Sequence, residues 1–114
     1  MKYIAVDTEY TYDYKAFIAT TTDEQLKSKL YILSDKKDFL ALHKICESDK
    51  VSKVFHAACN DIYALQNIGI NVIPPYDDTF IAARLVNENF QAAGLKKLAA
   101  EVLGEPCLEE KLLS

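Results

Sequence analysis

The sequence predicts an α/β domain, in which a mixed β-sheet has helices packed against it. Two observations lead to this prediction. Three short segments with strand character come first, and helical and strand-like segments then alternate. Consecutive strands favour a meander, and the later alternation favours strands joined by crossover helices, so the sheet should contain both antiparallel and parallel neighbours.

The first third of the chain predicts the meander. The apolar run Lys2–Thr8 is expected to form a buried strand with apolar residues on both faces. Ala16–Thr22 and Leu30–Leu33 are expected to form two more strands, and the polar residues around Asp23–Gln25 to turn the chain between them. Three neighbouring strands of this length would form one side of the sheet.

The pattern then changes to alternating helices and strands. Apolar residues at helical spacing predict a helix through Phe39–Cys46, capped by Ser34 or Asp35. The segments expected to follow are a strand at Val51–His56, a helix at Asn60–Ile68 that ends at Gly69, and a brief strand at Val72-Ile73 stopped by Pro74-Pro75. Asp77 or Asp78 should cap a helix running to about Val86, and Leu95–Val102 predicts a last amphipathic helix.

Composition limits the class of protein. The 114 residues are expected to form one domain, and no apolar stretch approaches the ~20 residues of a membrane helix. No signal peptide is visible, and three scattered cysteines without a Cys-x-x-Cys pair favour a reducing, cytoplasmic location over a zinc site or a disulfide framework. The net charge of −4 argues against a passive nucleic-acid-binding module more than against a metal nuclease, whose carboxylates are masked by cations.

Asp7 and Glu9 are the most informative residues of the chain. They end an apolar strand and lie two positions apart, so they should project from the same face. A pair of carboxylates beside a core is costly unless a positive charge neutralises it. Mg²⁺ or Mn²⁺ would supply that charge, and such ions commonly serve phosphoryl chemistry. The alternative is a strand that simply runs out into a polar turn.

A second candidate segment joins the strand at Val51–His56 to the next helix. The small residues Ala57 and Ala58 form the turn, and Asp61 lies on the first helical turn. Turns from strand to helix at one sheet edge are where α/β proteins gather polar groups. Asp61 could equally be a charge that favours the start of a helix through the helix dipole.

Four segments, taken in order, resemble motifs of the DEDD superfamily of 3′–5′ exonucleases. Val6–Glu9 resembles the first motif. His56–Asp61 resembles the second motif in its ribonuclease D form, in which a His-Ala pair precedes the metal-binding aspartate by the same interval. Asp78–Leu85 and Gly94–Gly104 resemble two helices shared by ribonuclease D-like proteins and the proofreading domain of family A DNA polymerases. The resemblance covers nearly the whole chain and implies a ribonuclease H-like fold, truncated at the C-terminus.

The resemblance also implies a reaction. It is phosphodiester hydrolysis with two Mg²⁺ or Mn²⁺ ions at the 3′ end of single-stranded RNA or DNA. By position, Asp7 would bridge both ions, Glu9 would bind the ion on the side of the nucleophile, and Asp61 would hold the second ion directly or through water. Base stacking and backbone contacts would bind the substrate. The candidate substrate contacts are Thr8, Tyr10, His56 and Ala57.

One part of the family pattern has no counterpart. The family carries a fourth acidic residue on a later helix, an aspartate in a Tyr-x-x-x-Asp or His-x-x-x-x-Asp setting. No aspartate in either setting follows Leu103-Gly104 before Ser114. Three explanations stay open: a fragment of a longer exonuclease, a catalytically incomplete module that binds nucleic acid or a protein, or a site completed by a second subunit. A missing helix would uncover apolar sheet surface, so a homo-oligomer is expected, and a strict monomer at high concentration would contradict it.

Overall fold

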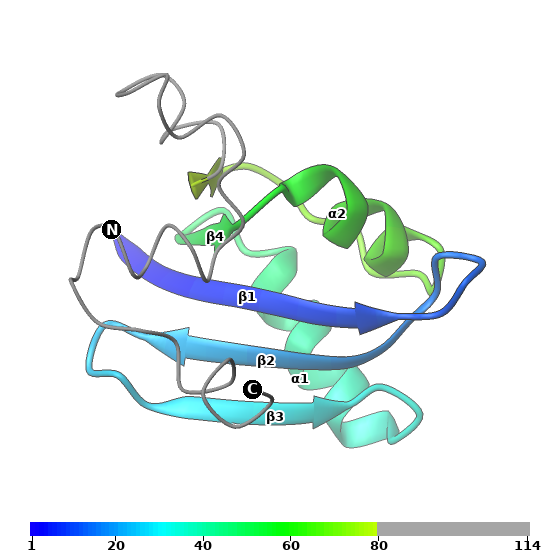
Figure 1. Ribbon diagram of the computed structural model, residues 1–114. Coiled ribbons are helices and arrows are strands. Elements are labelled where there is room, and N and C mark those ends of the chain that lie inside the picture. The colour runs from blue at the N-terminus through cyan, green and yellow to red at the C-terminus, as the bar shows by residue number, and fades with distance from the viewer. Residues whose placement is uncertain (80–114) are drawn as a thin grey trace, which may run out of the picture. The chain divides into compact units, whose positions relative to one another are not determined.

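The computed structural model describes residues 1–79, of which residues 1–78 form one compact unit. Five strands make a single sheet in the order β3-β2-β1-β4-β5 (Figure 1). The described elements, in chain order, are β1 (Lys2–Tyr10), β2 (Ala16–Asp23), β3 (Ser28–Ile32), α1 (Lys36–Cys46), β4 (Val51–Phe55), α2 (Ala58–Gln66) and β5 (Tyr76–Asp78). β2 pairs antiparallel with β1 and with β3, whereas β4 pairs parallel with β1 and with β5. The predicted mixed α/β sheet is therefore confirmed.

One face of the sheet carries the described core. Along β1, Ile4, Val6 and Thr8 are buried, whereas the residues between them are exposed. Leu42 and Cys46 of α1, and Ala64 and Leu65 of α2, complete the core on the buried side. The prediction that β1 is buried on both faces is therefore wrong, because within residues 1–79 one face of the strand is exposed. The exposed face holds Tyr3, Phe17, Leu30 and Ile32, each about half exposed.

Lys53 is an unusual core residue, because its side chain is fully buried in β4. Its Nζ atom donates a hydrogen bond to the Ser48 carbonyl oxygen at 2.6 Å, next to the C-terminal end of α1. Burial lowers the pKa of this lysine and raises the pKa of the nearby Cys46 thiol to about 12. Cys46 is therefore an unreactive packing residue at neutral pH.

Asp35 is the N-cap of α1, which settles the choice that the sequence left between Ser34 and Asp35. Its Oδ1 atom accepts the backbone N–H of Lys37 at 2.9 Å. Asp35→Ala is expected to lower the free energy of unfolding by about 1 kcal/mol, because one N–H at the helix start loses its partner. Thermal denaturation followed by circular dichroism measures this, with Ser34→Ala as the control. Equal stability of the two variants would contradict the assignment.

The fifth strand differs from its prediction. Val72-Ile73 is not a strand: Val72 packs against the core and the Ile73 N–H bonds to the Cys46 carbonyl at 3.1 Å. The chain joins the sheet only after the prolines, where the Lys53 N–H bonds to the Pro75 carbonyl at 3.1 Å and Tyr76 pairs with Lys53. Prolines lack an N–H donor, so pairing begins with a carbonyl at this edge.

Helix α2 begins two residues before the predicted Asn60, at Ala58, and Gly69 follows it with φ +93°, as expected of a residue after a helix. The helix predicted at Leu95–Val102, and the helix predicted from Asp78 to about Val86 beyond Thr79, lie outside the described residues, as do residues 80–114 of the single domain expected over residues 1–114. No helix within residues 1–79 is both long and apolar enough to span a membrane.

Candidate active site

Asp7 and Glu9 lie on β1, which has β2 on one side and β4 on the other. Both residues are on the exposed face of the strand, opposite Thr20 and Ile18 of β2. The prediction that the two carboxylates share one face is therefore confirmed, because β1 is regular up to Glu9 and shifts register only between Glu9 and Tyr10.

Asp61 approaches β1 from the first turn of α2 and is almost fully buried. The Thr8 hydroxyl donates a hydrogen bond to its Oδ1 atom. Burial is the largest influence on this carboxyl and raises its pKa; the Thr8 hydrogen bond opposes that rise, and the negative charges of Asp7 and Asp78 add to it. Asp61 is thus a desolvated carboxylate with acidic neighbours, which a bound cation would stabilise.

The start of α2, which carries Asp61, is held by Asp78. Ala57 precedes the helix with φ 59° and ψ 59° and offers no side-chain cap. The two carboxylate oxygens of Asp78 accept the N–H groups of Ala57 and Ala58, at 2.9 and 2.7 Å. The sequence predicted that Asp78 would cap the helix after it in the chain. In the structure Asp78 lies on the neighbouring strand β5 and caps α2. The partners are about twenty residues apart, and no local sequence pattern indicates such a contact.

A tyrosine-rich turn follows Glu9. In this segment, Tyr10–Lys15, the rings of Tyr10 and Tyr14 are stacked with centroids 5.4 Å apart, and Tyr14 meets Tyr63 of α2 at 5.6 Å. The Asn67 side-chain amide also donates to the Tyr14 carbonyl at 2.7 Å. Tyr12 is fully exposed and lines an open hollow of about 560 Å³ with Tyr10, Thr11 and Tyr14. The turn is therefore anchored on α2 and presents an aromatic ring to solvent.

The other candidate substrate contacts have mixed positions. Thr8 points into the core side, where its hydroxyl is bonded to Asp61. His56 is partly buried just after β4, and Ala57 is exposed with its N–H bonded to Asp78. Cys59 of α2 is exposed. Of the candidate contacts, Tyr10 thus lies in an aromatic surface, and Thr8 supports Asp61.

The three predicted ligands offer oxygen atoms only, the donor type that Mg²⁺ and Mn²⁺ prefer. Asp7 lies near enough to Asp61 for its charge to raise the pKa of Asp61. Within residues 1–79, however, no group of three or more His, Cys, Asp or Glu side chains is arranged to hold a metal ion. The chemistry of the donors fits a hard divalent cation, whereas the gathering of all three around one ion stays a prediction.

This mixed sheet, with Asp7 and Glu9 on its central strand, has the ribonuclease H-like fold of the solved structures described below. A family model described as 3′–5′ exonuclease matches residues 1–113, so the chain belongs to this exonuclease family. This confirms the resemblance seen in the motifs. No curated protein sequence matches the chain.

Solved structures show the same fold. Brucella melitensis NrnC bound to pGG superposes with a TM-score of 0.77 and 19% identity, over 92% of this chain and 54% of NrnC. Escherichia coli RNase D gives a TM-score of 0.75 and 20% identity, over 92% of this chain and 28% of RNase D. Pol1 of M. smegmatis, solved with a DNA primer-template and dNTP, gives 0.75 and 20%, over 90% of this chain and 19% of that one. The chain thus spans about half the length of NrnC and less of the others.

Proposed function

We propose that this domain takes part in 3′–5′ exonucleolytic hydrolysis of phosphodiester bonds in single-stranded DNA or RNA. The observation that carries the proposal is the buried Asp61 carboxylate, which accepts a hydrogen bond from Thr8 and whose pKa is raised by burial and, to a smaller extent, by the charge of Asp7. Membership of the exonuclease family supports it. So do NrnC structures solved with pGG and with Mg²⁺, although these ligands are recorded for NrnC.

Asp7, Glu9 and Asp61 would hold one or two Mg²⁺ or Mn²⁺ ions. When bound, such ions lower the pKa of an attacking water and offset the charge on the leaving 3′ oxygen. The chain's own residues prepare the site: Thr8 fixes one oxygen of Asp61, and Asp78 fixes the start of the helix that carries it. Asp7 and Glu9 lie on the exposed face of β1, the face opposite to Thr8, where a substrate would approach them.

The tyrosine-rich turn would bind the single strand. Tyr12→Ala is expected to weaken binding of a short single-stranded oligonucleotide about 5- to 100-fold, because one base loses its stacking partner. Stability should not change, since Tyr12 is fully exposed. Fluorescence anisotropy measures the affinity, and Tyr12→Phe, which keeps an aromatic ring, is the control. Unchanged affinity in Tyr12→Ala would remove this residue from the substrate surface; His56 and Ala57 would remain candidate contacts.

A second candidate is a catalytically incomplete module that binds nucleic acid or another protein. It is favoured by the positions of the three predicted ligands, since Asp7 and Glu9 lie on the exposed face of β1 whereas Asp61 is almost fully buried and bonded to Thr8. A homo-oligomer or a second subunit would be the partner of such a module. The half-exposed side chains on the open sheet face are consistent with such an assembly. A cytoplasmic location stays a prediction from the cysteines.

A cleavage assay separates the two candidates. The 114-residue chain is incubated with 5′-labelled single-stranded DNA and RNA in Mg²⁺ or Mn²⁺. A ladder of products shortened from the 3′ end is expected, and Asp7→Ala should abolish it because a carboxylate that would hold a metal ion is lost. The preferred nucleic acid follows from the same gel. Folded protein that binds the strands but leaves them intact would instead support the non-cleaving module.

A further inference from the structure

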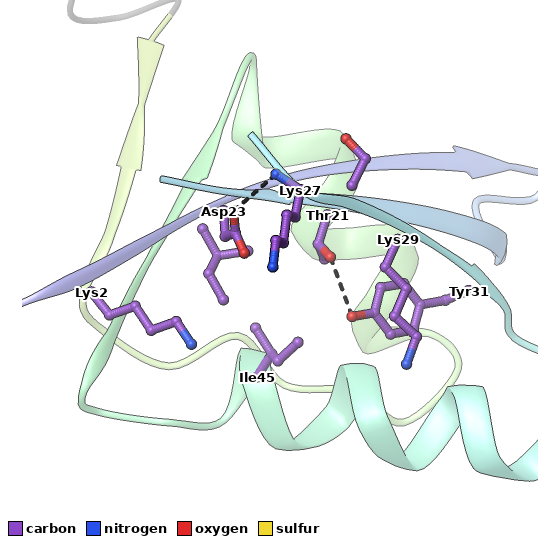
Figure 2. Close-up of a pocket in the computed structure, with 9 residues that line it drawn as sticks. Lys2, Thr21, Asp23, Lys27, Lys29, Tyr31 and Ile45 are labelled. Carbon is purple, nitrogen blue, oxygen red and sulfur yellow. Dashed lines mark hydrogen bonds between the residues drawn. The ribbon is translucent and has the colours of Figure 1, made fainter. Parts of the chain in front are cut away.

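A second pocket lies at the other end of the sheet from Glu9. It is formed by the beginning of β1, the β2–β3 turn and the last turn of α1, and it encloses about 240 Å³. We call it the lysine pocket; Figure 2 shows its residues. Its lining comprises Lys2, Ile4, Thr21, Asp23, Lys27, Ser28, Lys29, Tyr31 and Ile45. None of these is a predicted ligand of the candidate active site.

The charges that line this pocket are mostly positive, although the whole chain carries −4. Lys2, Lys27 and Lys29 contribute three ammonium groups, and within residues 1–79 none of them is in an ion pair. Lys29 instead lies over the Tyr31 ring, 5.1 Å from its centroid. The one lining acid, Asp23, accepts the backbone N–H groups of Gln25 and Lys27, both at 2.9 Å. The pocket therefore has positive charge in excess.

Two buried hydroxyl groups provide directional hydrogen bonding beside these positive charges. The Thr21 hydroxyl donates to the Tyr31 hydroxyl oxygen at 3.2 Å, and both residues are buried (Figure 2). Since the Tyr31 oxygen accepts that bond, its own proton can be donated to a ligand. In Figure 2 the side chains of Lys2 and Lys27 extend into the space between the sheet and Ile45. A ligand there would meet ammonium groups and a hydroxyl donor beside an apolar wall.

We propose that the lysine pocket binds the phosphate group of a nucleotide, either as a free mononucleotide or within an oligonucleotide. A phosphate offers several oxygens to donors arranged around it, and it forms charge-assisted hydrogen bonds with ammonium groups. A carboxylate has only two oxygens and would leave donors unmatched. The assignment does not rest on cleavage at Asp7 and Asp61, because the pocket is made of other residues.

NMR titration of the ¹⁵N-labelled chain tests the assignment. AMP and a short DNA oligonucleotide are added in EDTA, so that cations cannot bring phosphate to the carboxylates. Shifts are expected at the amides of Thr21, Lys29 and Tyr31. The triple variant Lys2→Gln, Lys27→Gln, Lys29→Gln should bind about tenfold more weakly, because three charged donors are lost. Shifts with AMP would identify a mononucleotide site; shifts with the oligonucleotide alone would identify a strand-binding site.

A matched variant separates this site from general electrostatics. Lys36→Gln, Lys37→Gln, Lys44→Gln removes the same charge from exposed positions of α1 that do not line the pocket. It should bind like the wild type. Tyr31→Phe should weaken binding without a change in charge. Shifts absent from the pocket, or equal losses in the two triple variants, would overturn the assignment.

Discussion

Asp61→Asn is expected to raise the thermal stability of the domain while lowering its metal-dependent cleavage by at least about 100-fold. The loss of rate follows from removing a charged ligand at the proposed site. The gain in stability follows from relieving a buried negative charge that lies near Asp7 and Asp78. Asparagine has the same shape and can still accept the Thr8 hydrogen bond, so little else changes.

The sign of the pH dependence is fixed by the direction of the shift. Burial raises the pKa of Asp61 in the folded state, so folding disfavours its ionised form. The stability that the neutral form provides is fully present below the unfolded pKa, about 3.9, and is lost as pH rises through the folded pKa. Wild type and Asp61→Asn should therefore have similar melting temperatures at low pH, and the variant should melt higher at pH 7.

Melting curves at several pH values without divalent ions measure this effect. Asp13→Asn is the control, because the Thr11 hydrogen bond lowers the pKa of Asp13 and no relief is expected there. Added Mg²⁺ should stabilise the wild type and leave Asp61→Asn unchanged. A variant that is less stable than the wild type at pH 7, or equally active, would contradict the role given to Asp61.

Asp78→Ala is expected to lower the free energy of unfolding by about 1–2 kcal/mol, which is ~4–8 °C for each kcal/mol in a domain of this size. Two N–H groups, those of Ala57 and Ala58, lose their acceptors, and α2 has no side-chain cap of its own. Cleavage should fall as well, because Asp61 lies on the first turn of the same helix.

Neighbouring substitutions isolate this contact. Asp77→Ala removes a carboxylate one residue away, which within residues 1–79 accepts a long hydrogen bond of 3.4 Å from the Ser52 hydroxyl, so its effect should be small. Asp78→Asn keeps one oxygen acceptor and should fall between the wild type and Asp78→Ala. Calorimetry gives the stabilities, and the cleavage assay gives the rates. If Asp78→Ala had the same melting temperature as the wild type, the stabilising role given to the Asp78 cap of α2 would be wrong.

The first four strands and helix α1 could be predicted because their signals are local. Alternation put Asp7 and Glu9 on one face of β1, and the acidic residue at the helix start was identified as Asp61. The same reasoning misplaced the fifth strand. The β-propensity of Val72-Ile73 was overruled by the pairing of Tyr76 with Lys53, a contact across more than twenty residues.

The sequence by itself determined the class of fold, the family motifs and the order of the acidic residues, since periodicity and spacing are properties of short segments. Only the tertiary structure decided which groups meet. Thr8 bonds to Asp61, Asp78 caps a helix that precedes it in the chain, and the lysines of three segments surround one pocket. Such contacts depend on sheet register and on the way helices pack, and these are set by burial over the whole domain rather than by neighbouring residues.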